Sequence, residues 1–94
     1  MRILRSHTTP QFEKDFLSLP KDIRLKAERK IKLFEANCFH PSLRAHKLKG
    51  ILRDFWSFSI NRTYRVIFKF LENNEVIYYR IGRHDIYQQL EKLV

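Results

Sequence analysis

The second half of the sequence carries the side chains that can cut RNA without a metal ion. Two segments stand out, Tyr64–Phe68 (YRVIF) and Ile81–Tyr87 (IGRHDIY). Histidine titrates near neutral pH, arginine holds a phosphate with two parallel hydrogen bonds, and tyrosine adds a hydroxyl and an aromatic face. Attack of a ribose 2′-OH on the adjacent phosphate needs a base, an acid and positive charge on the phosphoryl oxygens. The two segments supply residue types suited to these roles.

Arg65 is the first candidate for holding a phosphate. Alternation of side chains along a strand over residues 64–70 places Arg65 and Lys69 on one face, opposite Val66 and Phe68. An arginine in the middle of such a strand needs an anionic partner, either inside the protein or outside it. A basic sheet face suits the phosphate backbone of a nucleic acid.

His84 and Tyr87 are the candidates for proton transfer. His84 follows Gly82-Arg83 at the end of a predicted strand, and a histidine placed there beside Arg83 can act as a general acid or base. Tyr87 lies three residues further on, so one helical turn brings it to the same face as His84. The alternatives are a surface histidine near a helix start and a tyrosine that packs the C-terminal tail.

His46 lies in a predicted loop, Arg44–Gly50, that is rich in basic residues. It is a contact to a phosphate or a base, a proton carrier, or an ordinary polar surface residue. Between Leu43 and Lys69 there is one acid, Asp54, against seven basic side chains. The RNA-binding candidates are Lys47, Lys49, Arg53, Arg62 and, further along the chain, Arg83.

Length and charge set the class of protein. The 94 residues predict one domain over positions 1–94 with a single core. The net charge is +9, from 19 Lys and Arg against 10 Asp and Glu. This exceeds the magnitude of roughly 2–8 that keeps a small domain soluble, so the sequence predicts a polyanionic partner, either nucleic acid or an acidic protein.

The sequence predicts neither a metal site nor a cofactor. The chain has one cysteine, Cys38, the acids Asp54 and Asp85 are far apart, and there is no glycine-rich phosphate loop. No apolar run reaches the roughly 20 residues that span a bilayer. We therefore expect a cytoplasmic protein, with no membrane contact, that is stabilised by packing alone.

Local patterns predict the order of the elements. A strand over residues 2–7 is followed by a helix with Thr9 as N-cap and Pro10 in its first turn. That helix turns Phe12, Phe16 and Leu17 inward and Glu13, Lys14 and Asp15 outward, whereas Pro20 opens a second helix that runs to about Glu35 and buries Ile23, Ala27, Ile31 and Phe34.

Period-two alternation then predicts three antiparallel strands over residues 55–60, 64–70 and 75–81, with a short helix in the tail 84–94. The predicted fold is α+β: an N-terminal strand, a helical hairpin, a three-stranded antiparallel meander and a short C-terminal helix, with the helices on one face.

Five short sequence segments, in this order along the chain, resemble those of one family: Phe12–Phe16 with Leu19-Pro20, His46–Gly50 (HKLKG), Trp56–Ile60 (WSFSI), Tyr64–Phe68 and Ile81–Tyr87. Together they resemble the RelE/ParE superfamily of bacterial type II toxins over nearly the whole chain. The resemblance implies a small basic toxin neutralised by an antitoxin that wraps it. For the RelE-like branch it implies a ribosome-dependent endonuclease (mRNA interferase) that cleaves mRNA in the ribosomal A site.

The resemblance also implies roles for single residues. Arg65 matches the strand arginine that contacts the scissile phosphate, His84 falls where several branches place a catalytic histidine, and Tyr87 resembles the C-terminal aromatic. His46 and Lys47 match a basic loop position. Where some branches have a glutamate, or a histidine and an aspartate, this chain has Asp54, Ser59 and Thr63. The candidates for the general base are therefore His84, the first choice, and His46, the second.

Two other functions fit the same resemblance. A ParE-like toxin would inhibit DNA gyrase by binding, without nuclease activity. An inactive member would serve as antitoxin partner and touch DNA only as a toxin–antitoxin complex. In each case we expect an acidic, amphipathic antitoxin that covers the basic sheet face or packs along the helices.

Overall fold

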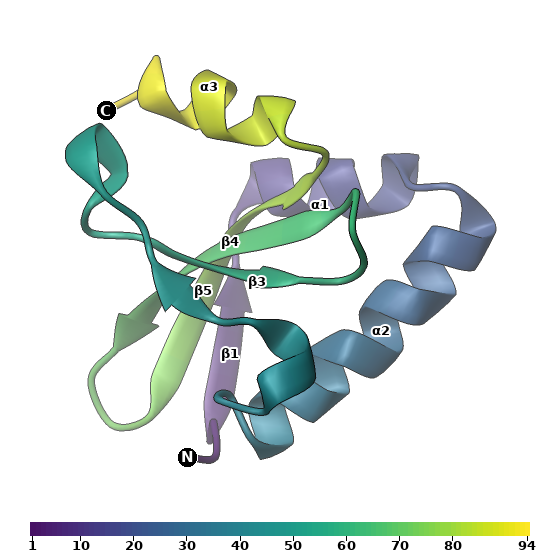
Figure 1. Cartoon of the computed structure of the whole chain (residues 1–94), viewed down its shortest axis with the longest axis vertical. Coiled ribbons are helices and arrows are strands. Elements are labelled where there is room, and N and C mark those ends of the chain that lie inside the picture. The colour runs from purple at the N-terminus through teal and green to yellow at the C-terminus, as the bar shows by residue number, and fades with distance from the viewer.

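The computed structural model describes all 94 residues, and it confirms the predicted α+β fold (Figure 1). None of its helices is long and apolar enough to cross a membrane. Between Ala36 and Trp56 the chain also makes two short 3₁₀ turns, Pro41–Leu43 and Gly50–Leu52. The elements are β1 (Arg5–Thr8), α1 (Pro10–Ser18), α2 (Lys21–Ala36), β2 (His46–Lys47), β3 (Trp56–Ser59), β4 (Arg65–Leu71), β5 (Glu75–Gly82) and α3 (Asp85–Glu91).

The strands form one five-stranded sheet in the order β1-β5-β4-β3-β2. β1 runs parallel to β5, and the other neighbours are antiparallel. The predicted start of the first strand is wrong, because the backbone N–H groups of Ile3 and Leu4 donate to Glu35 and Asn74 outside the ladder. The predicted loop at His46 is also wrong, since His46 and Lys47 pair with β3 as an edge strand.

The main core lies between the sheet and the first two helices. Phe34 of α2 stacks on Phe58 at 4.5 Å between ring centroids and meets Phe68 edge-on at 4.8 Å. The predicted alternation is confirmed, because Phe58, Val66 and Phe68 are fully buried in this cluster. Burying such large aromatic side chains is the dominant favourable contribution to folding here.

The start of α1 is as predicted, but one of its inward residues is not. The Thr9 side chain accepts a hydrogen bond from the Phe12 N–H at 3.1 Å, and this satisfies one of the free donors of the first turn. Phe12 is buried, whereas Leu17 is 71% exposed. The prediction that Leu17 faces the core is therefore wrong.

The C-terminal helix covers the other face of the sheet. Ile86 and Leu90 of α3 pack with Leu52, Phe55 and Ile67 in a second, smaller cluster. Ile67 points away from its neighbours Val66 and Phe68, so it needs apolar cover on that face. The expectation that all helices share one face is wrong for α3.

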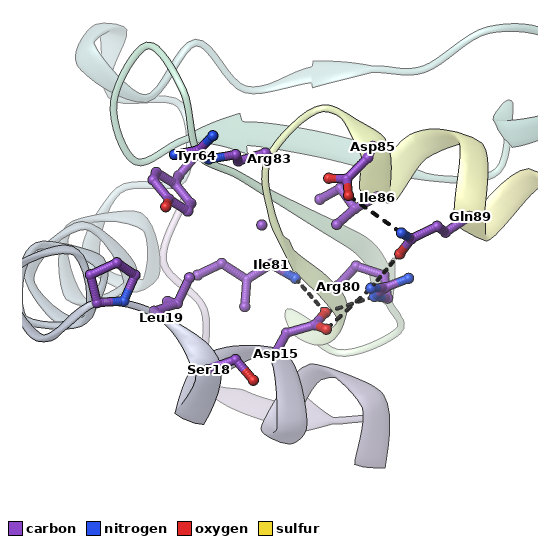
Figure 2. Close-up of a pocket in the computed structure, with 12 residues that line it drawn as sticks. Asp15, Ser18, Leu19, Tyr64, Arg80, Ile81, Arg83, Asp85, Ile86 and Gln89 are labelled. Atoms are coloured by element: carbon purple, nitrogen blue, oxygen red, sulfur yellow. Dashed lines mark hydrogen bonds and ion pairs between the residues drawn. The ribbon is translucent and has the colours of Figure 1, made fainter.

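A buried ion pair joins these two layers around the sheet. The Arg80 guanidinium donates to the Asp15 carboxylate through Nε at 2.6 Å and Nη2 at 3.1 Å, and through Nη2 to the Gln89 side chain at 2.9 Å (Figure 2). The Ile81 N–H also donates to Asp15, at 3.1 Å. Asp15, predicted to point outward, is therefore an internal partner that links α1, β5 and α3.

A β-bulge aims Arg80 at this partner. Ile67 pairs with Arg80 and Phe68 with Tyr78, so Tyr79 has no opposite residue. The extra residue shifts the alternation of β5, since Tyr78 and Ile81 both lie in the main core. Bulges commonly redirect one side chain in this way.

Replacing the acid of this pair should destabilise the whole domain. We expect Asp15→Asn to lower the free energy of unfolding by about 3 kcal/mol, because it leaves a buried arginine without its counter-charge. Urea denaturation measures the change, with Glu28→Gln on the exposed side of α2 as the control. Equal stability of the two variants would show that the pair contributes little.

Candidate functional site

The structure gathers two of the predicted site residues around Ser57. His46 lies directly opposite Ser57 in the β2–β3 ladder, so both side chains lie on the same face of the sheet. The hydroxyls of Ser57 and Tyr87 form a hydrogen bond of 2.7 Å. Ser57 is fully buried, and this bond satisfies its hydroxyl and fixes the tyrosine.

His84 completes this group from the start of α3. Its ring lies 6.0 Å from the ring of Tyr87 between centroids, at 32° between the planes. The prediction that one helical turn brings these side chains together is confirmed. His84 is exposed and its side chain makes no hydrogen bond within the protein, so both ring nitrogens are open to a ligand.

The ring of His46 is held by the backbone. Its Nδ1 lies 2.9 Å from the carbonyl oxygen of Arg44. A carbonyl only accepts, so Nδ1 carries the hydrogen and Nε2 carries the lone pair in the neutral ring. Arg44 stands at φ 51°, a left-handed conformation that few residues other than glycine adopt. The geometry equips His46 to take up a proton through Nε2.

Arg65 lies at the start of β4 and not in its middle. Its Nη1 donates to the backbone carbonyls of Asn61 and, at 3.1 Å, of Tyr64. Of the two kinds of anionic partner that the sequence allowed, an internal one does not contact Arg65, and the β3–β4 turn supplies neutral acceptors to the guanidinium instead. Arg65 thus has no carboxylate partner within the protein and has further N–H groups for an external anion.

The other basic candidates are spread over the molecule. Lys47 lies opposite Trp56, so it points to the other face from its neighbour His46. Arg53 folds back to the Gly50 carbonyl at 3.4 Å. Lys49 precedes that 3₁₀ turn. Lys47, Lys49 and Arg53 thus do not gather on one sheet face.

Arg83 and Lys69 both lie over aromatic rings. The Arg83 guanidinium is 5.6 Å from the ring centre of Tyr64 (Figure 2), and its polar interaction with Tyr64 raises the pKa of Arg83. The ammonium group of Lys69 is 4.5 Å from the ring centre of Phe55. These cation–π contacts place both charged groups over aromatic rings of the protein.

A depression of about 240 Å³ lies where β5 leads into α3, and Arg83 lines it, whereas His46, Ser57, His84 and Tyr87 do not. Figure 2 shows Tyr64 and Arg83 on one wall and Asp15 and Arg80 on the other, with the first turn of α3 alongside. No group of three or more His, Cys, Asp or Glu side chains could hold a metal ion. The charged side chains that line the depression are Asp15, Arg80, Arg83 and Asp85.

Three residues of this region were missed in the sequence. Ser57 was visible as one of the two polar members, with Ser59, of the alternating run Trp56–Ile60, which marks it as facing away from the main core. Asp15 and Arg80 stand 65 positions apart, and nothing local marks them as a pair. Their role becomes visible only with the folded chain.

The chain belongs to the family of HigB-like toxins, RelE-like toxins of type II toxin–antitoxin systems, whose family model matches residues 11–84. It is a toxin of the RelE/ParE superfamily, as the sequence phrases indicated. No curated protein matches it in sequence.

Solved structures of similar toxins share the fold. The YoeB/ParE toxin from Agrobacterium tumefaciens has a TM-score of 0.73 at 15% identity, over 86% of this chain and 99% of that one. YafQ from E. coli strain BL21(DE3) has a TM-score of 0.67 at 15% identity, over 93% and 98%. The toxin–antitoxin complex RelBE2 from Mycobacterium tuberculosis gives 0.71 at 16%, over 85% and 96%.

Gly82 is required where β5 passes under α3. A Cβ built on Gly82 would lie 2.8 Å from Cγ2 of the buried Ile86. We expect Gly82→Ala to cost about 2 kcal/mol of unfolding free energy, because α3 must move away. A double-mutant cycle with Ile86→Ala, measured by urea denaturation, should show a smaller cost than the sum of the single changes. Additive costs would contradict this close approach.

Proposed function

We propose that this toxin is a ribosome-dependent mRNA endonuclease that cleaves RNA without a metal ion. The observation that carries the proposal is that His46 lies opposite Ser57 in the β2–β3 ladder, while Tyr87 is hydrogen-bonded to Ser57 and the ring of His84 lies against Tyr87. Two histidines with accessible nitrogens on one face supply a base and an acid. The domain over residues 1–94 would carry the whole activity.

In the proposed reaction His46 is the base and His84 the acid, which reverses the order favoured from the sequence. Nε2 of His46 takes the proton of a ribose 2′-OH, and the 2′-oxygen forms a bond to the adjacent phosphorus. The bond from phosphorus to the 5′-oxygen breaks, and His84 donates a proton to that oxygen. The products are a 2′,3′-cyclic phosphate and a 5′-hydroxyl end.

Arg65 and Tyr87 support this reaction in different ways. The free N–H groups of Arg65 stabilise the charge that develops on the phosphoryl oxygens. Tyr87 is held by Ser57 at 2.7 Å and lies against His84, so we assign it the role of a positioning residue. The other basic candidates would contact the phosphate backbones of the mRNA and of the ribosomal RNA; they are Lys47, Lys49, Arg53, Arg62 and Arg83.

An antitoxin is the expected protein partner. The family is defined by two-component systems, and one structure similar to this chain is a YoeB–YefM complex from Staphylococcus aureus. With a net charge of +9, we expect an acidic antitoxin that masks the basic residues near the site.

The test compares histidine variants in cells and in a translation assay. Induced wild type should arrest growth and cut a reporter mRNA, as read by primer extension. His46→Ala and His84→Ala should each lower the cleavage rate by about 10²-fold or more. His7→Ala is the control, because His7 lies on β1 and binds Glu75 at 2.7 Å.

The pH dependence separates the two roles. A base must be unprotonated and an acid protonated, so His46→Ala should remove the rise of the rate on the acidic side, and His84→Ala the fall on the alkaline side. Arrest with intact mRNA and inhibited gyrase supercoiling would contradict nuclease activity and support a ParE-like inhibitor. Absence of arrest would support an inactive antitoxin partner.

A further inference from the structure

A second depression, of about 330 Å³, lies between α2, the first 3₁₀ turn and the β3–β4 turn. Five of its lining side chains are cationic, and none is a carboxylate; the cations are Lys26, Lys30, Arg44, Arg62 and Arg65. We call this the basic depression. It differs from the depression of Figure 2, where Asp15 and Asp85 balance the arginines.

The charges of the basic depression are not neutralised within the protein. The ion pairs of the structure are Arg80–Asp15 and His7–Glu75, and neither involves these five residues. Lys30 contacts only the Ser42 hydroxyl, at 3.5 Å, and Arg65 contacts backbone carbonyls. Like charges gathered in a concave surface repel one another and concentrate positive potential there, so an anion bound among them is favourable.

The groups in the basic depression match a phosphate. Lys26 and Lys30 are four positions apart on α2, so their side chains lie on the same side of the helix. The guanidinium groups offer forks of N–H donors that fit phosphate oxygens. The hydroxyl groups of Ser42 and Ser59 line the same space and add neutral donors.

Two residues join the basic depression to the proposed catalytic residues. The carbonyl of Arg44 holds the ring of His46, while Arg44 also lines the depression. Arg65 pairs in the sheet with Gly82, two residues before His84. An RNA strand that lies across His46 and His84 would therefore continue into the basic depression.

We propose that the basic depression binds a backbone phosphate of the same RNA strand, at a nucleotide neighbouring the one that is cut. This inference rests on the proposed function for its choice of RNA. Its consequence is that Lys26 and Lys30 contribute to RNA affinity without taking part in proton transfer. Both belong to α2, which lies with α1 on the face of the sheet opposite α3.

The test measures binding apart from cleavage. A 2′-O-methyl oligoribonucleotide has no free 2′-OH and cannot be cut, so fluorescence anisotropy at several salt concentrations reports binding alone. We expect the double variant Lys26→Gln/Lys30→Gln to raise the Kd about tenfold. The slope of the logarithm of the binding constant against the logarithm of the salt concentration should become less steep by about 0.7 for each phosphate that the variant no longer neutralises. The matched control is Lys14→Gln/Lys21→Gln, which removes equal charge from exposed positions of α1 and α2.

Equal affinities of the two double variants would overturn the inference, even if the wild type cuts mRNA and the proposed function stands. The inference is also overturned if Lys26→Gln/Lys30→Gln weakens binding to polyglutamate but not to the oligonucleotide, because the depression would then be a protein-binding surface. Loss of RNA binding in that variant, with no cleavage by the wild type, would support the phosphate site and contradict the nuclease. Amide shifts of Ser42 and Asn61 on adding the oligonucleotide would support the location.

Discussion

The ion pair between Asp15 and Arg80 is the interaction on which the arrangement of this toxin depends. It is nearly buried, with side-chain exposures of 9% and 11%, and it joins α1 on one side of the sheet to α3 on the other through Gln89. α3 has only seven residues and is too short to be stable alone. Its position is therefore set by this pair together with the packing of Ile86 and Leu90.

The two faces of the sheet carry different tasks. One face buries the large aromatic side chains against α1 and α2, and this gives the domain its stability. The other face is only partly covered by α3, so it has room for the polar row formed by His46, Ser57 and Tyr87. A rigid core below the row is what permits its side chains to hold fixed positions.

Features with a local signature could be predicted from the sequence, and features without one could not. Alternation over β3 and β4 indicated the buried faces, and Thr9 marked the start of α1. A two-residue strand such as β2 has no period to detect. The bulge opposite Ile67 changes the alternation of β5, and the partner of Arg80 lies in a different element. The resemblance to a toxin family could be inferred from short sequence segments in a fixed order. The shared face of His46 and Tyr87 could be inferred only from the sheet register and the hydrogen bond to Ser57.

Amide hydrogen exchange tests most directly whether the ion pair sets the position of α3. In wild type we expect protected amides in α3 from Gln88 to Glu91 and in the central strand β4. In Asp15→Asn, under conditions where the domain stays folded, protection should fall in α3 and persist in β4. Unchanged protection of α3 in that variant would contradict the account.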